Sequence, residues 1–137
     1  MPAIRVPLHL RWSDVDAYGH VNNAAIVGLL EEARVQAFWR DDDPILPPLT
    51  STSDAWVLVA EVHVKYRRVI DHRTEPIEAE VSISKCAGAS FVIAYRLLVD
   101  GLECVTANTT MALVDGATGL PTRIGPELRA RLLEFSS

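Results

Sequence analysis

The sequence has little of what membrane, secreted or metal-binding proteins require. No apolar run approaches the roughly 20 residues of a membrane-spanning helix, and the N-terminal residues MPAIRVPLHL lack the apolar core of a signal peptide. Its two cysteines, Cys86 and Cys104, lie in predicted strands without a CxxC motif or a neighbouring histidine. We interpret them as free thiols that pack as small apolar side chains, not as a disulfide or metal ligands. We therefore expect a cytoplasmic protein without a membrane partner or a metal.

Positive charge is also scarce. The 137 residues carry a net charge of −5, which disfavours binding to nucleic acid through neutralisation of phosphates. There is no internal repeat and no low-complexity segment. Hydrophobic residues make up 49% of the chain and charged residues 23%, which is typical of a globular protein with a core. We expect residues 1–137 to form a single domain.

A helical pattern occupies residues 23–39. Apolar side chains recur there at spacings of three and four residues, at Ile26, Leu29, Leu30, Ala33, Ala37 and Phe38. Asn22 or Asn23 is a suitable N-cap, and the acids and prolines of residues 41–54 end the helix. Gly28 costs about 1 kcal/mol relative to alanine in a helix interior. This cost indicates that a packed sheet or a ligand approaches that turn.

The other apolar residues alternate with a period of two, which is typical of strands. A first strand is predicted over residues 4–12, and Pro7 confines it to a sheet edge or to its first part. Four more strands are predicted over residues 57–70, 77–86, 91–99 and 102–114, followed by a short helix after Pro126. Asp100-Gly101 is a strong hairpin signal. One face of the second strand is predicted to hold Leu58, Ala60, Val62, Val64 and Tyr66.

This order of elements predicts an α+β fold. An antiparallel sheet that curls around one long central helix would cover the apolar face of that helix. The outer face of the sheet would then be half apolar, with residues such as Val57, Val59 and Leu98. Because such a face often packs against a second copy, we expect a homodimer or a homotetramer.

A polar loop precedes the helix directly. It gathers Asp14, Asp16 and His20 within seven residues, and a loop that only turns the chain needs no such collection. The helix N-terminus behind it offers free N–H groups and the positive end of a dipole. We predict that this loop is a catalytic site and that the start of the helix belongs to it.

The string DVDAYGHVNN, the helix after it and the four following strands resemble the hotdog-fold thioesterases, most closely the 4-hydroxybenzoyl-CoA thioesterase-like family. The resemblance extends from about Val6 to Pro126. It implies a hotdog fold and hydrolysis of an acyl-CoA thioester to a free acid and coenzyme A, without a cofactor. It also implies that Asp16 is the catalytic carboxylate and that a backbone N–H near Asn23 polarises the thioester carbonyl.

The chemistry agrees with this assignment. Thioester hydrolysis needs a base that activates water or a carboxylate that attacks the carbonyl, and donors for the developing oxyanion. His20 is either a second catalytic group, as in related plant acyl-carrier-protein thioesterases, or a histidine that closes the loop. We predict that Tyr18 and Gly19 contact the substrate, Gly19 through positive φ or close approach. Asp14 fits a structural acceptor for loop N–H groups better than a catalytic group.

Two alternatives concern other charged residues. Some hotdog thioesterases draw their carboxylate from the central helix, where Glu31 or Glu32 lies, although the EEAR context favours a solvated or interface face with an ion pair to Arg34 or Arg40. The basic stretch that contains Arg67 and Arg68 could bind the phosphates of coenzyme A, or it could be a solvated strand end. The chain departs from the family pattern directly after Arg68. Val69-Ile70 stands where the family usually has a proline followed by Gly-Asp.

The substrate and the class of function also have alternatives. An acyl-carrier-protein thioesterase would recognise a carrier-protein surface and would not need the cluster of Arg67 and Arg68. A non-catalytic acyl-CoA-binding hotdog protein would use the same fold to bind ligand. We expect acyl-CoA to be the substrate, and the aliphatic or aromatic nature of the acyl group is open.

Overall fold

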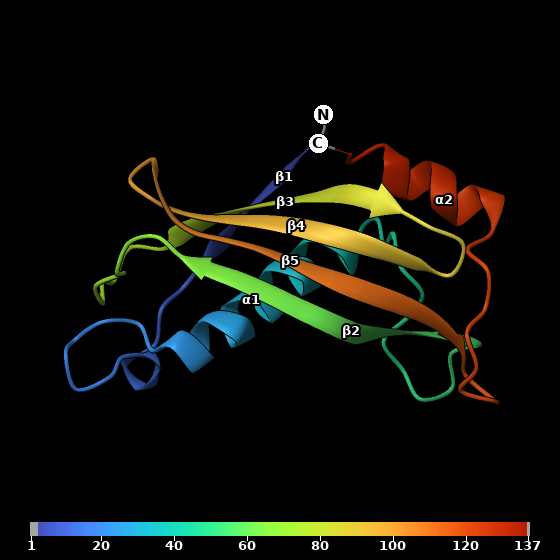
Figure 1. Ribbon diagram of the computed structural model, residues 1–137, viewed down its shortest axis with the longest axis horizontal. Coiled ribbons are helices and arrows are strands. Elements are labelled where there is room, and N and C mark those ends of the chain that lie inside the picture. The colour runs from blue at the N-terminus through green and yellow to red at the C-terminus, as the bar shows by residue number, and fades with distance from the viewer. Residues whose placement is uncertain (1–2, 137) are drawn as a thin grey trace.

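Five strands form one antiparallel sheet, and the long helix α1 lies across one face of it (Figure 1). The computed structural model describes residues 3–136. In chain order its elements are β1 (Ile4–Leu8), η1 (Trp12–Asp14), α1 (Asn23–Phe38), β2 (Ala55–Tyr66), β3 (Ile77–Cys86), β4 (Ser90–Val99), β5 (Leu102–Asp115) and α2 (Pro126–Leu133). The strand order is β1-β3-β4-β5-β2. The predicted α+β fold, with an antiparallel sheet around one long helix, is confirmed.

The first strand is shorter than predicted. β1 ends at Leu8, because the chain turns afterwards into the 3-10 turn η1, where Asp14 accepts a hydrogen bond from the backbone N–H of Arg11. Pro7 lies on this edge strand, as expected for a residue that cannot donate a ladder hydrogen bond. The predicted Asp100-Gly101 hairpin is confirmed, with φ of 51° and 83° at its two residues.

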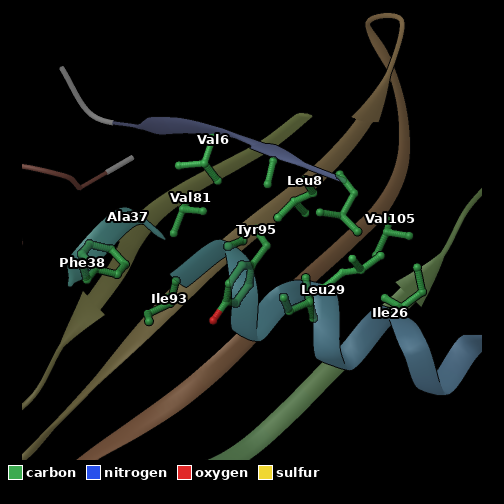
Figure 2. Packing of buried hydrophobic residues seen from close by; sticks show 14 of the residues in the cluster. Val6, Leu8, Ile26, Leu29, Ala37, Phe38, Val81, Ile93, Tyr95 and Val105 are labelled. Carbon is green, nitrogen blue, oxygen red and sulfur yellow. The ribbon is translucent and has the colours of Figure 1, made fainter. Parts of the chain in front are cut away.

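The helix begins and ends close to the predicted positions. The side chain of Asn22 accepts a hydrogen bond of 2.8 Å from the N–H of Ala24, so Asn22 is the N-cap. The apolar side chains of α1 pack with those of β1, β3 and β4 into one core, in which Tyr95 and Phe38 are among the largest fully buried side chains (Figure 2). Residues 41–54 follow α1 as a loop.

The predicted faces of β2 are wrong before Glu61. A β-bulge between Val59 and Glu61 shifts the register, so that Val59 pairs with Met111 and Val62 pairs with Thr109. Met111 and Thr109 are both buried on the helix side of the sheet. The side chains of β2 that share this face are therefore Val57, Val59, Val62, Val64 and Tyr66. Leu58 lies on the opposite, outer face. Val57 and Val59, which were predicted for the outer face together with Leu98, lie on the helix side instead.

The helix leaves the inner face of β2 partly uncovered. Val59 and Val62 point to the helix side of the sheet, yet they are 42% and 39% exposed. β2 is also the edge strand of the sheet, on the side opposite β1. A strip of apolar surface therefore lies open between α1 and β2. No helix of the described residues is long and apolar enough to cross a membrane.

Candidate functional site

The loop before α1 is closed around the Asp16 carboxylate. Its Oδ1 accepts hydrogen bonds from the backbone N–H groups of Tyr18, at 2.9 Å, and His20, at 3.3 Å. The N–H of Asp16 donates to the carbonyl of His20, and Gly19 adopts a φ of +79° that favours glycine. Within residues 3–136, the other carboxylate oxygen of Asp16 has no hydrogen-bond donor. One oxygen therefore orients the group and the other is available for chemistry.

The start of α1 supplies a backbone N–H donor beside this loop. The N–H of Asn22 donates to the carbonyl of Asp14 at 2.7 Å, and the Asn22 side chain caps Ala24. The next N–H, that of Asn23, meets no acceptor in the part of the chain that the structure describes. It lies at the positive end of a 16-residue helix, where a developing negative charge is stabilised.

Asp16 and Asn23 line the same cleft, which has a volume of about 310 Å³. This volume lies at the lower end of the range for small-molecule sites. Five of the seven predicted site residues meet there, together with side chains from the end of β2 and from β5. The lining residues are Asp16, His20, Val21, Asn23, Ile26, Tyr66, Arg67, Arg68, Val69, Ile70 and Val105. The cleft combines a carboxylate, backbone donors and cations around an apolar floor.

Two of the predicted residues stand outside the cleft lining. The side chain of Tyr18 is directed to solvent, with the residue 84% exposed, and Gly19 contributes the turn. The Tyr18 backbone N–H still takes part in the site because it donates to Asp16. These two residues shape the loop in this chain, and their contact with a substrate stays a prediction.

His20 lies at the cleft and also contacts the segment after β2. It lines the cleft, and its backbone pairs with Asp71, in the segment after β2. Its Nε2 lies 3.5 Å from Oδ1 of Asp71. The neighbouring Val21 donates its N–H to the carbonyl of Ile70. These contacts hold the loop against the end of β2 while the imidazole remains at the cleft.

Asp14 has the surroundings of a structural carboxylate. Its side chain is 3% exposed and forms an ion pair of 2.9 Å with Arg11. Burial alone would raise the pKa of Asp14, but hydrogen bonds from the side chain and the backbone of Arg11 outweigh it and hold that pKa below its usual value. The ionised Asp14 therefore secures η1, and its carbonyl receives the N–H of Asn22.

Arg67 and Arg68 differ in their surroundings. The Nε of Arg67 donates to the hydroxyl of Thr106 at 3.2 Å and lies 3.5 Å from Oε2 of Glu103. The guanidinium of Arg68 has no acceptor among residues 3–136. Both backbone N–H groups donate to the carbonyl of Cys104, which fixes the chain at the end of β2. Arg68 is thus the less engaged of the two cations at the cleft.

Tyr66 also lines the cleft, although the sequence does not point to it as a site residue. Its hydroxyl donates to the carbonyl of Asn23 at 3.0 Å and joins the end of β2 to the start of α1 across the cleft. The alternation of β2 placed Tyr66 on an inner face, but nothing in the sequence places the helix start opposite it. Neither Glu31 nor Glu32 lines this cleft. Both line a larger cleft of about 540 Å³ between α1 and residues 8–14.

The sequence profile of the Thioesterase-like superfamily matches residues 10–132. The match spans most of the chain, so the protein belongs to this superfamily, and its fold is the hotdog fold. Family membership supports hydrolysis of thioesters. No curated protein matches the chain.

Solved structures with thioesterase assignments are similar over nearly the whole chain. A predicted thioesterase from Bacillus stearothermophilus is 20% identical with a TM-score of 0.85, covering 98% of this chain and 97% of its own. A thioesterase from Thermus thermophilus, complexed with coenzyme A and Zn, is 24% identical with a TM-score of 0.79, covering 93% and 95%. DHNA-CoA thioesterase from Staphylococcus aureus is 16% identical with a TM-score of 0.81, covering 96% and 89%. At these identities the similarity establishes the fold.

Among the described residues, no group of three or more His, Cys, Asp or Glu side chains lies close enough to hold a metal ion. Cys86 and Cys104 are free thiols. Burial raises the pKa of the Cys104 thiol, which favours its neutral form, as expected for a cysteine that packs as an apolar residue.

Proposed function

We propose that this protein is an acyl-CoA thioesterase, which hydrolyses its substrate to a free acid and coenzyme A. The observation that carries the proposal is the Asp16 carboxylate, in the same cleft as the N–H of Asn23; one carboxylate oxygen is fixed, and the other oxygen and this N–H have no partner within residues 3–136. Membership of the Thioesterase-like superfamily supports thioester hydrolysis. The coenzyme A bound to the similar Thermus thermophilus thioesterase supports a coenzyme A substrate.

In the proposed mechanism, Asp16 acts as a base or as a nucleophile. As a base it takes a proton from water while the water oxygen bonds to the thioester carbon. As a nucleophile its carboxylate oxygen bonds to that carbon, loss of the sulfur leaves a mixed anhydride, and water then hydrolyses the anhydride and restores the carboxylate. In both cases the negative charge on the carbonyl oxygen faces the N–H of Asn23. The C–S bond then breaks, and the sulfur leaves with a proton as the thiol of coenzyme A.

The remaining predicted residues take supporting roles in this proposal. His20 lies at the cleft, where it can hold the loop or donate the proton to the leaving sulfur. Gly19 and the Tyr18 backbone keep Asp16 in place, and Asn23 provides the oxyanion donor. Arg67 and Arg68 both line the cleft, and we assign phosphate binding to Arg68, because Arg67 is already engaged with Thr106 and Glu103.

Release of free thiol from a panel of acyl-CoA thioesters tests the proposed function. We expect turnover of at least one aliphatic or benzoyl-type member of the panel. A parallel measurement uses the same acyl groups on an acyl carrier protein, because that alternative substrate needs no nucleotide contact. Faster turnover on the carrier protein would show that the substrate is an acyl carrier protein and not acyl-CoA. Binding of acyl-CoA without any hydrolysis would identify a non-catalytic acyl-CoA-binding protein.

We also propose that the protein assembles as a homodimer, which could double to a homotetramer. β2 is a 12-residue edge strand whose free ladder positions can pair with a second copy. Leu58, Val59 and Val62 on this strand are 39–48% exposed. We expect sedimentation at micromolar concentration to give at least twice the mass of the 15.1 kDa chain. A single species with the mass of one chain would contradict this proposal.

A further inference from the structure

Two aromatic side chains that the proposed mechanism does not use form a pair beside the catalytic loop. Trp12 lies in η1 and His72 in the segment after β2, and their ring centroids are 5.2 Å apart with an angle of 82° between the planes. In such an edge-to-face pair, at least one face of the indole ring is not covered by the imidazole. Trp12 is also 77% exposed. A flat aromatic surface is therefore open to solvent at this place.

The pair adjoins the Asp16 cleft. Arg68, Val69 and Ile70 line that cleft, and His72 follows Ile70 by two residues. Four residues of extended chain span at most about 14 Å, so the backbone of His72 lies within this distance of the backbone of Arg68. Figure 1 shows the blue segment that contains η1, the start of α1 and the end of β2 at the same end of the sheet. The open indole face therefore stands near the cation that we assign to phosphate binding.

Both members of the pair are held against the catalytic loop. The turn η1, which carries Trp12, is secured by the ion pair of the buried Asp14. The residue before His72 is Asp71, whose carboxylate lies 3.5 Å from the imidazole of His20 in the loop. A ring that is fixed before binding loses little further freedom when a ligand stacks on it. The pair is thus a preorganised surface and not a freely moving side chain.

The charges around the pair suit a nucleotide. The chain as a whole is acidic, so an anionic ligand depends on a local cation. Arg68 is this cation, because its guanidinium has no acceptor among residues 3–136. The one acid between Arg68 and His72 in the sequence is Asp71, and its carboxylate is turned to His20. In a nucleotide a single ribose joins the base to its phosphates, so a phosphate on Arg68 leaves the base within reach of Trp12.

We infer that Trp12, supported by His72, is a stacking site for the adenine ring of the coenzyme A substrate. This inference rests on the proposed function. The Asp16 cleft has a volume of about 310 Å³, which is small even for a drug-sized ligand, so the nucleotide of coenzyme A has to lie outside it. An aromatic side chain stacks on the face of a base without hydrogen bonds to its edges.

A second copy of the chain is the other occupant that an exposed tryptophan could meet. The adenine ring is favoured because the indole adjoins both the cleft and Arg68. The contact between copies that we propose uses the edge strand β2, to which neither Trp12 nor His72 belongs. Sedimentation of the variants below separates these two occupants.

Binding of free coenzyme A to the parent protein tests the inference without any hydrolysis. We expect coenzyme A to quench the tryptophan fluorescence, because the stacked adenine contacts the indole of Trp12. Phosphopantetheine, which lacks the adenosine but keeps a phosphate, should leave the fluorescence nearly unchanged. The Trp12→Phe variant should lose the quenching. It should still bind coenzyme A within about threefold of the parent affinity in calorimetry, because phenylalanine keeps a ring that can stack.

The Trp12→Leu variant removes the aromatic ring altogether. It should bind coenzyme A about tenfold or more weakly than the parent protein and should bind phosphopantetheine as the parent does. The matched control is Leu120→Ala, because Leu120 is an apolar side chain that is 64% exposed. Leu120 pairs with Asp115, at the end of β5 away from the cleft, so its replacement should keep the parent affinity for coenzyme A.

Equal or absent quenching by the two ligands in the parent protein overturns the inference. This comparison needs no variant, so a variant that fails to fold does not remove the test. Quenching that persists in Trp12→Phe also overturns it, as does a Trp12→Leu protein that binds coenzyme A like the parent or loses equal affinity for both ligands. A lower mass of Trp12→Leu in sedimentation, with unchanged affinity for coenzyme A, would assign Trp12 to contact between copies.

Hydrolysis by the parent protein is measured separately, so the two proposals can fail independently. Turnover of acyl-CoA without adenine-dependent quenching keeps the proposed function and rejects the stacking site. Adenine-dependent quenching without turnover supports the stacking site and rejects the proposed hydrolysis.

Discussion

Replacing Asp16 with asparagine is expected to abolish hydrolysis of acyl-CoA while the fold is retained. Asparagine keeps the oxygen that accepts from Tyr18 and His20, so the loop should stay closed. It removes the negative charge that a base or nucleophile needs, and the loss should be about three orders of magnitude in kcat. The measurements are kcat on the best acyl-CoA of the panel and the melting temperature of both proteins.

Asp115→Asn is the matched control for this experiment. The Oδ1 of Asp115 also accepts two backbone hydrogen bonds within a turn, from Ala117 at 2.9 Å and Thr118 at 3.0 Å. These bonds lower the pKa of Asp115, and the residue lies outside the Asp16 cleft. Its replacement should leave kcat unchanged. If Asp16→Asn keeps both the parent kcat and the parent melting temperature, Asp16 is not the catalytic carboxylate.

Features fixed by neighbouring residues could be predicted from the sequence. The helix from Asn23, its Asn22 cap and the Asp100-Gly101 hairpin each depend on side chains a few positions apart. The Asp16 loop belongs to the same group, because it precedes its helix directly in the chain. Short-range patterns in the sequence therefore suffice to place the carboxylate beside the helix N-terminus.

Features fixed by strand register could not be predicted in this way. The extra residue in β2 near Ala60 changes which side chains face α1, and alternation alone gives no sign of it. The bulge directs Val59 toward the helix, where Val59 and Val62 line a cleft of about 260 Å³ beside α1. An error of one residue in register thus concealed this cleft.

The surroundings of Arg34 show the same limit. The sequence EEAR favoured a solvated or interface face for this part of the helix. The structure confirms an ion pair between Arg34 and Glu31, but it buries the Arg34 side chain next to the hydroxyl groups of β4 and β5. Tyr95 and Thr109 are more than 60 residues away in the chain. Only the curl of the sheet brings them to the helix.

The second large effect is expected from Arg68, at the mouth of the cleft. Arg68→Gln should raise the KM for acyl-CoA about tenfold at low salt and leave kcat nearly unchanged. The reason is that the guanidinium of Arg68 has no acceptor within residues 3–136 and is exposed beside the cleft, where it can meet a phosphate. A phosphate contact stabilises the bound substrate and the transition state equally, so its loss raises KM more than it lowers kcat.

Arg67→Gln is the matched control, because this neighbouring arginine already bonds to Thr106 and lies near Glu103. Its loss should change KM little. The effect of Arg68→Gln should shrink at high salt, since an exposed charge is screened, and it should vanish on an acyl-pantetheine that lacks the nucleotide. An equal rise in KM on the truncated substrate would show that Arg68 does not bind the nucleotide. Unchanged KM values in both variants would place the phosphates elsewhere or indicate a carrier-protein substrate, whose recognition would not depend on either arginine.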